Sequence, residues 1–135
     1  MQPRNTIRSS WRIELSALAV LLALSALSAH AAPARLKTAD ILAALSGNSV
    51  VGTWGSTEFH QYFDPNGSTV YVPRSGNMAN GSWRVHDDLY CSTWPPTDSE
   101  TCYTLTRDGD TLTWQATDGG NPHPSTLIKG KSLDW

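Results

Sequence analysis

Three side chains that could transfer protons or hold a metal ion alternate along one expected strand: Glu58, His60 and Tyr62. If Asn66-Gly67 forms a two-residue hairpin loop, Tyr71 on the following strand lies opposite Tyr62. Such groups on one face could act as an acid/base or metal cluster. The alternative is the solvated outer face of a half-buried sheet. We favour it because alternating polar and apolar residues are typical of such sheets.

Aromatic residues indicate a different chemistry, the binding of a small planar or sugar-like ligand by rings with a polar edge. The alternative for Trp54, Trp83, Tyr103 and Trp114 is that they fill a narrow interior. We favour it for these four because their strand faces also carry aliphatic residues. Trp94 lies between the two cysteines and could contact a ligand or pack on a barrel rim. The candidate ligand-binding residues are Trp94, Tyr62, Tyr71, Trp54 and Arg84.

Patterns typical of metal sites and catalytic sites do not occur in the sequence. His60, His86 and His123 lie on different expected elements, and there is no His-x-x-x-His or Cys-x-x-Cys spacing. There is also no Gly-x-Ser-x-Gly motif, and the glycine-rich segments open no helix that could bind phosphate. We therefore expect no catalytic residues, no metal and no cofactor.

The first 31 residues are typical of a secretory signal. A basic region with three arginines precedes an apolar stretch, residues 15–27, and Ala29-His30-Ala31 offers a cleavage site. The apolar stretch is shorter than the ~20 residues that span a bilayer, so a retained membrane anchor is the less favoured alternative. We expect a soluble periplasmic or secreted product, residues 32–135, that forms one domain.

The charge balance bears on the class of partner. The whole chain has 10 basic and 12 acidic residues. Removal of the signal takes away three arginines and one glutamate, which makes the product more acidic. A mildly acidic chain without a Lys/Arg cluster argues against binding to nucleic acid or to anionic lipid. The expected partner is a small ligand or an exported protein.

The only two cysteines, Cys91 and Cys102, are expected to form a disulfide because the chain is exported. Free reactive thiols are the alternative, which is less favoured because no His or Lys lies nearby in the sequence to lower a thiol pKa. The bond would close a short loop and stabilise the fold by roughly 2–3 kcal/mol.

The elements that position these residues are short strands joined by explicit turns. Thr38 is expected to cap a helix of about two turns that ends at Gly47. A strand starts at Gly52, and further strands are expected at residues 57–63, 68–73, 81–86, 89–94, 101–106, 111–116 and 125–128. These elements predict an all-β fold, an up-and-down antiparallel barrel of about eight strands, with the helix covering one end. A β-sandwich is the alternative.

Two turns set the expected registers. The Asn66-Gly67 loop pairs Phe63 with Val70 as well as Tyr62 with Tyr71. An Asp108-Gly109 loop pairs Leu105 with Leu112 and Tyr103 with Trp114, with Cys102 on the opposite face. The pair Asp87-Asp88 is expected to form the turn between these hairpins.

Several short segments follow one another along the chain: Leu45-Ser46-Gly47-Asn48, Tyr62-Phe63-Asp64-Pro65-Asn66-Gly67, Gly81-Ser82-Trp83-Arg84-Val85, Cys91 with Trp94, Cys102-Tyr103 and Arg107-Asp108-Gly109-Asp110. Together they resemble a family of short exported bacterial proteins of unknown function, which implies no activity. Gly52-Thr53-Trp54 also resembles the opening of lipocalins and avidins, which implies a small ligand-binding β-barrel. The helix before this tripeptide and the single disulfide are similar to periplasmic barrel inhibitors of metalloproteases. In those inhibitors an N-terminal segment, here residues 32–37, enters the protease.

Three functions therefore remain in order of preference. The first is non-enzymatic binding of a small ligand or an envelope component, which requires a pocket lined by Tyr and Trp with one or two polar groups. The second is inhibition of an exported hydrolase, which a filled interior and a protruding segment 32–37 would favour. The third is an enzyme, which requires Glu58, His60 and Tyr71 to converge in a cleft.

Overall fold

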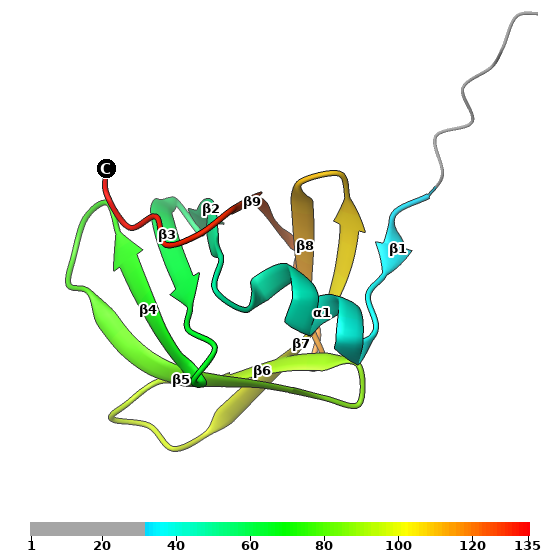
Figure 1. Ribbon diagram of the computed structural model, residues 1–135. Coiled ribbons are helices and arrows are strands. Elements are labelled where there is room, and N and C mark those ends of the chain that lie inside the picture. The colour runs from blue at the N-terminus through cyan, green and yellow to red at the C-terminus, as the bar shows by residue number, and fades with distance from the viewer. Residues whose placement is uncertain (1–31) are drawn as a thin grey trace, which may run out of the picture.

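Eight antiparallel strands form a closed barrel in the computed structural model, which describes residues 32–135 (Figure 1). The expected export signal, residues 1–31, lies outside the described residues. The barrel strands are β2 (Ser49–Trp54), β3 (Thr57–Phe63), β4 (Ser68–Pro73), β5 (Ala79–His86), β6 (Leu89–Thr93), β7 (Glu100–Asp108), β8 (Thr111–Ala116) and β9 (His123–Ile128). Each pairs with the next, and β9 also pairs with β2. The predicted up-and-down barrel is confirmed, and the sandwich alternative is excluded by this closure.

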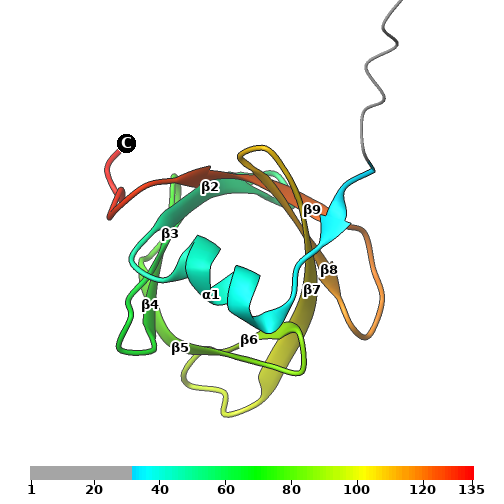
Figure 2. The ribbon, with the colours of Figure 1, turned by 45° about the vertical axis from the view of Figure 1, so that its right-hand side comes forward.

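The helix α1 (Thr38–Leu45) lies across one end of the ring of strands (Figure 2). Ile41 and Leu45 are fully buried and belong to the same core cluster as Phe63 and Leu112. An amphipathic helix of two turns does not persist alone, so this packing stabilises it. The expected helix covering one end of the barrel is therefore present.

The start of α1 differs from the expectation in one detail. Lys37, not Thr38, is the N-cap residue, and Thr38 is the first helical residue. The backbone N–H of Thr38 donates to the carboxylate of Asp88 at 2.7 Å, and the hydroxyl of Thr38 accepts from the Asp88 N–H at 3.0 Å. Asp40 accepts from the Lys37 N–H at 3.3 Å, and the second side chain that satisfies the helix start comes from the β5–β6 turn, which local sequence could not indicate.

A short strand, β1 (Ala34–Arg35), lies outside the barrel and pairs with β7 at Thr106 and Arg107. The next residue, Leu36, is buried, and its N–H donates to the carbonyl of Leu105 at 2.8 Å. The lead-in to α1 is thus held on the barrel wall. No helix within residues 32–135 has the length and apolar character needed to cross a membrane.

The β3–β4 register corrects the expectation by one residue. Tyr62 pairs with Val70, and Gln61 pairs with Tyr71. The loop holds three residues, because Asp64 N–H donates to Ser68 O at 2.9 Å and Gly67 takes a left-handed conformation with φ of 90°. A turn that ends in a left-handed glycine is the usual three-residue hairpin loop. A shift of one residue exchanges faces, so Tyr71 points into the barrel and Tyr62 points out.

The β7–β8 register also differs, but by two residues. Leu105 pairs with Trp114, Arg107 with Leu112 and Tyr103 with Ala116, so the loop is Gly109-Asp110. A shift of two residues preserves faces. The apolar side chains therefore remain inside, as expected. The Asp87-Asp88 turn is confirmed, with positive φ at both residues, which is typical of a type I′ turn.

Candidate functional site

The end of the barrel opposite α1 is hollow and forms an open cavity of about 400 Å³. Its mouth lies at Trp54, Ala79, Trp94 and His123, which stand at the strand ends remote from the helix. Seven of the lining residues are Phe, Tyr or Trp: Trp54, Phe59, Tyr71, Tyr90, Trp94, Tyr103 and Trp114. The other five are Gln61, Ala79, Ser92, His123 and Pro124. The aromatic residues thus surround a space instead of filling it.

The cavity wall carries a small polar group of atoms centred on Gln61. Its amide Nε2 donates to Thr69 Oγ1 at 3.0 Å and to the Tyr90 hydroxyl at 3.2 Å. These two bonds hold the carboxamide in place and leave its carbonyl oxygen as an acceptor. Burial raises the pKa of Tyr90 well above its usual value, so this phenol stays protonated at neutral pH. The buried wall therefore offers neutral hydrogen-bonding groups.

Aromatic stacking shapes the mouth. Trp54 is 44% exposed and stacks on the His123 ring with 3.9 Å between ring centroids. The expectation that Trp54 fills the interior is therefore wrong, because β2 carries it to the open end. On the neighbouring strands β3 and β4, Tyr71 stacks on Phe59 with 4.9 Å between ring centroids. Both pairs present flat apolar surfaces at the hollow end.

Trp94 closes a third part of the rim. Its indole Nε1 donates to Ser92 Oγ at 3.2 Å, and its ring meets Tyr71 edge-on at 6.2 Å. The ring also lies against Gly81, where a β-carbon would come within 2.7 Å of a ring atom. Of the two alternatives for Trp94, the structure has it packed on the rim, where it also lines the cavity.

The ionisable side chains among the cavity-lining residues are one histidine and three tyrosines. Within residues 32–135, no Asp, Glu, Lys or Arg lines it. Burial also raises the pKa of Tyr71 and Tyr103, and the negative charge of Asp118 adds to the rise at Tyr103. These phenols are therefore uncharged at neutral pH.

The structure divides the sequence-predicted binding residues into two groups. Trp54, Tyr71 and Trp94 line the cavity. Tyr62 and Arg84 lie outside it, because both face outward from their strands. Tyr62 lies under the ammonium group of Lys131, 5.2 Å from the ring centroid, and Arg84 lies on the outer face of β5.

The possible acid/base cluster does not come together. Glu58 forms an ion pair with Arg74 on the outer surface. His60 Nδ1 hydrogen-bonds the carbonyl of Ser132 at 3.0 Å, and its ring contacts Trp135. Tyr71 faces the interior, so the trio is split between the two faces of the sheet.

Sequence reasoning missed the polar lining residues Gln61, Ser92 and His123. A signal for Gln61 was present, since it alternates with Phe59 and Phe63 and so faces inward with them. A polar residue at an inward position of a small barrel indicates either a satisfied core group or a cavity. Only the structure, which gives the burial and the hydrogen bonds of Gln61, distinguishes a satisfied core group from a cavity-lining one.

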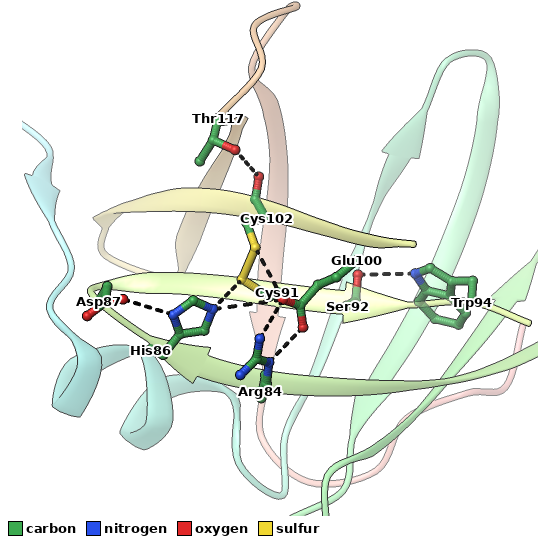
Figure 3. Close-up of a disulfide and its surroundings, with 9 residues drawn as sticks. All are labelled: Arg84, His86, Asp87, Cys91, Ser92, Trp94, Glu100, Cys102 and Thr117. Carbon is green, nitrogen blue, oxygen red and sulfur yellow. Dashed lines mark hydrogen bonds and ion pairs between the residues drawn. A yellow bond between two sulfur atoms is a disulfide. The ribbon is translucent and has the colours of Figure 1, made fainter. Parts of the chain in front are cut away.

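The disulfide is confirmed. Cys91 and Cys102 are direct cross-strand partners on β6 and β7 and are bonded, on the outer face of the barrel (Figure 3). His86 Nε2 lies 3.3 Å from Cys91 Sγ. The expectation that no histidine lies near the cysteines was wrong, because the Asp87-Asp88 turn folds His86, on the adjacent strand β5, back against Cys91. Glu100, bound by Arg84 through two hydrogen bonds of 2.7 Å, completes this outer cluster.

Comparison with known proteins gives no relative: no family model, curated protein or solved structure matches the chain. The barrel architecture is consistent with the expected lipocalin-like fold, while the resemblance to exported bacterial proteins has no support from these comparisons. The arguments about function therefore come from the site.

Proposed function

We propose that this protein is a non-enzymatic carrier or receptor for a small, uncharged and largely aromatic ligand. The observation that carries the proposal is the cavity of about 400 Å³, whose walls are mostly aromatic side chains. This volume lies in the range of small-molecule sites, which are concave and apolar with a few polar groups.

The shape of the rim favours a planar ligand. The stacked pairs Trp54–His123 and Phe59–Tyr71 present ring faces at the hollow end. Offset stacking of a flat ligand on such faces is worth about 0.5–1.5 kcal/mol beyond the area that it buries. The carbonyl oxygen of Gln61 would accept a hydrogen bond from a ligand N–H or O–H group.

The lining residues also argue against a charged ligand. Transfer of an ionised group from water into an apolar cavity is costly unless an opposite charge pairs with it. Within residues 32–135, no Asp, Glu, Lys or Arg lines the cavity to supply such a charge. We therefore expect neutral ligands to bind more tightly than charged molecules of the same shape.

The test uses two fluorescent probes that share an aromatic skeleton. N-phenyl-1-naphthylamine is neutral, and 8-anilinonaphthalene-1-sulfonate adds a sulfonate. We expect the neutral probe to bind one per chain, with a blue-shifted and enhanced emission, and the sulfonate to bind at least about tenfold more weakly. Absence of saturable binding by the neutral probe would overturn the cavity proposal. Equal affinities would overturn the requirement for a neutral ligand.

A matched pair of variants places the probe. Tyr71→Ala removes a cavity wall, and we expect the affinity for the neutral probe to fall about tenfold. Tyr62→Ala removes a tyrosine from the outer face of the adjacent strand, so the affinity should not change. Ala79→Trp would place a bulky ring in the mouth and should abolish binding. A loss in Tyr62→Ala equal to that in Tyr71→Ala would contradict binding inside the barrel.

The alternatives are less well supported. An inhibitor that acts through residues 32–37 needs a free segment, whereas Ala34–Arg35 pair with β7 and Leu36 is buried. An enzyme that uses Glu58, His60 and Tyr71 needs groups that here lie on opposite faces. A disulfide is typical of oxidising compartments, which supports our proposal that the protein works in the periplasm or outside the cell. In that compartment, an envelope component would be a source of the ligand.

A further inference from the structure

Four potential metal ligands lie together on the outer face of the barrel, on three neighbouring strands. They are His86 on β5, Cys91 on β6, and Glu100 and Cys102 on β7. One ligand atom from each lies within 4.8 Å of the others. Figure 3 shows the histidine ring and the carboxylate directed at the two sulfur atoms. Two cysteines with a histidine and a carboxylate make a donor set suited to zinc.

The residues around this cluster hold its ligands in the orientation that a metal requires. His86 Nδ1 hydrogen-bonds the Asp87 carboxylate at 3.1 Å, and Nε2 points at Cys91 Sγ, 3.3 Å away. In metal sites, a ligating histidine almost always donates its other ring N–H to such a partner. Glu100 is fixed in the same way, because Arg84 holds both of its oxygens.

We propose that reduction of the Cys91–Cys102 disulfide creates a tetrahedral zinc site made by His86, Cys91, Glu100 and Cys102. The disulfide accepts two electrons and two protons from a dithiol, which itself becomes a disulfide. Zn²⁺ then displaces the two thiol protons and binds two thiolates, the neutral Nε2 of His86 and one oxygen of Glu100. The disulfide and the metal exclude each other, because both use the two sulfur atoms.

The separations between the four ligand atoms can be compared with those that tetrahedral zinc requires. Tetrahedral zinc with Zn–S bonds of about 2.3 Å and Zn–N or Zn–O bonds of about 2.0–2.2 Å places its ligand atoms roughly 3.3–3.8 Å apart. The distance from His86 Nε2 to Cys91 Sγ is 3.3 Å, and those from Glu100 Oε1 to Cys102 Sγ and to His86 Nε2 are both 3.9 Å. Reduction allows the two sulfur atoms to separate, and the ligand atoms, which now lie within 4.8 Å of one another, must then approach by up to about 1 Å to reach tetrahedral spacing.

The position of the cluster is compatible with metal entry and independent of the ligand cavity. The side chains of His86 and Glu100 are 37% and 29% exposed, so the metal can approach from solvent. Tyr90 and Ser92, the neighbours of Cys91, line the cavity on the opposite face of β6. The zinc proposal therefore does not depend on what the cavity binds.

The experiment is a Co²⁺ titration of the purified protein, with and without a phosphine reductant that is oxidised to the phosphine oxide. We expect the reduced protein to bind one Co²⁺ per chain, with thiolate-to-cobalt charge-transfer bands and the intense visible bands of a tetrahedral site. Zn²⁺ should remove these bands because it binds such sites more tightly than Co²⁺. The oxidised protein should show none of them. Absence of these bands from the reduced protein would overturn the proposal.

Variants test whether all four ligands take part. His86→Ala and Glu100→Gln should each weaken Co²⁺ binding at least about tenfold. Asp87→Asn should weaken it by roughly 10–100-fold through the orientation of His86. His123→Ala, which removes a histidine at the cavity mouth, is the matched control and should bind as the wild type does. Unchanged titrations of both His86→Ala and Glu100→Gln would show binding by the two thiols alone and would refute the site.

A second readout covers the case in which reduction loosens the fold. If the reduced protein loses its near-ultraviolet circular dichroism, one equivalent of Zn²⁺ should restore it, because binding at a site of native geometry stabilises the folded state. Failure of Zn²⁺ to restore the signal would overturn the proposal.

Discussion

Gly81 is the position at which a single methyl group best tests the structure of the cavity rim. A β-carbon at Gly81 would lie 2.6 Å from the carbonyl oxygen of Thr93 and 2.7 and 2.9 Å from two ring atoms of Trp94. Contacts of this length force a neighbour to move. The φ angle of Gly81 is not positive, so alanine meets no backbone penalty there. The effect of Gly81→Ala is therefore crowding.

The expected magnitude follows from two opposing contributions. Overpacking of this kind costs about 1–3 kcal/mol. Replacement of glycine by alanine at a permitted conformation contributes about 0.4–1 kcal/mol of stability through the unfolded chain. We expect Gly81→Ala to lower the free energy of unfolding by about 1–2 kcal/mol. For a domain of this size, that lowers the melting temperature by about 4–8 °C for each kcal/mol.

The assay is urea denaturation of a double-mutant cycle with Trp94→Ala. Without the indole, only the Thr93 carbonyl still crowds the new methyl group, so the penalty of Gly81→Ala should fall by at least about 0.5 kcal/mol. Trp135→Ala removes an exposed tryptophan elsewhere and should leave the penalty unchanged. If Gly81→Ala is as stable as the wild type, the placement of Trp94 on Gly81 is refuted. The same holds if Gly81→Ala costs equal stability in the wild-type, Trp94→Ala and Trp135→Ala backgrounds.

Two further predictions concern the disulfide and the turn that holds α1. Cys91→Ser should lower the free energy of unfolding by about 2–3 kcal/mol and the melting temperature by about 10 °C or more in non-reducing buffer, where an unchanged melting temperature would contradict a stabilising bond. Hydrogen bonds from Thr38 and Lys37 hold the pKa of Asp88 below its usual 3.8. The folded-state pKa is the lower one, so this stabilisation is present above pH 3.8 and is lost as the pH falls through the folded value. Asp88→Asn should therefore flatten the dependence of melting temperature on pH below 3.8, and identical slopes for wild type and variant would disprove the role of this carboxylate.

The strands were predictable because alternation and turn residues act locally. The bounds of β3, β4 and β8 agree with the expected ranges to the residue. Registers were less predictable, because a hairpin loop of two or three residues fits the same sequence. At Asp64-Pro65-Asn66-Gly67, proline fixes the first turn position and glycine takes the left-handed one that ends the loop. That single extra residue moves Tyr71 from the outer face to the cavity.

The outer cluster was not predictable for a related reason. Motif spacing detects ligands that are close in the sequence, such as a pair separated by two or three residues. His86 approaches Cys91 because β5 and β6 are joined by the tight Asp87-Asp88 turn, and Glu100 approaches because β7 pairs with β6. Ligands on neighbouring strands become visible only after the cross-strand register is known.

The hollow end itself follows from the asymmetry of the barrel. Periodicity shows that Trp83 and Trp114 face inward, but not which end of the interior is filled. At one end, α1 inserts Ile41 and Leu45 among the core residues, and these side chains are completely buried. At the other end, no comparable element within residues 32–135 covers the opening, and Trp54 remains 44% exposed. Aromatic surface that stays in contact with water does not contribute to the hydrophobic stabilisation of the fold. A bound ligand that covers it would stabilise the complex by about 25 cal/mol for each Å² of apolar surface removed from water. The helix end of the interior is therefore filled and the other end open, so truncation of a half-buried lining residue such as Tyr71 enlarges a cavity that already exists.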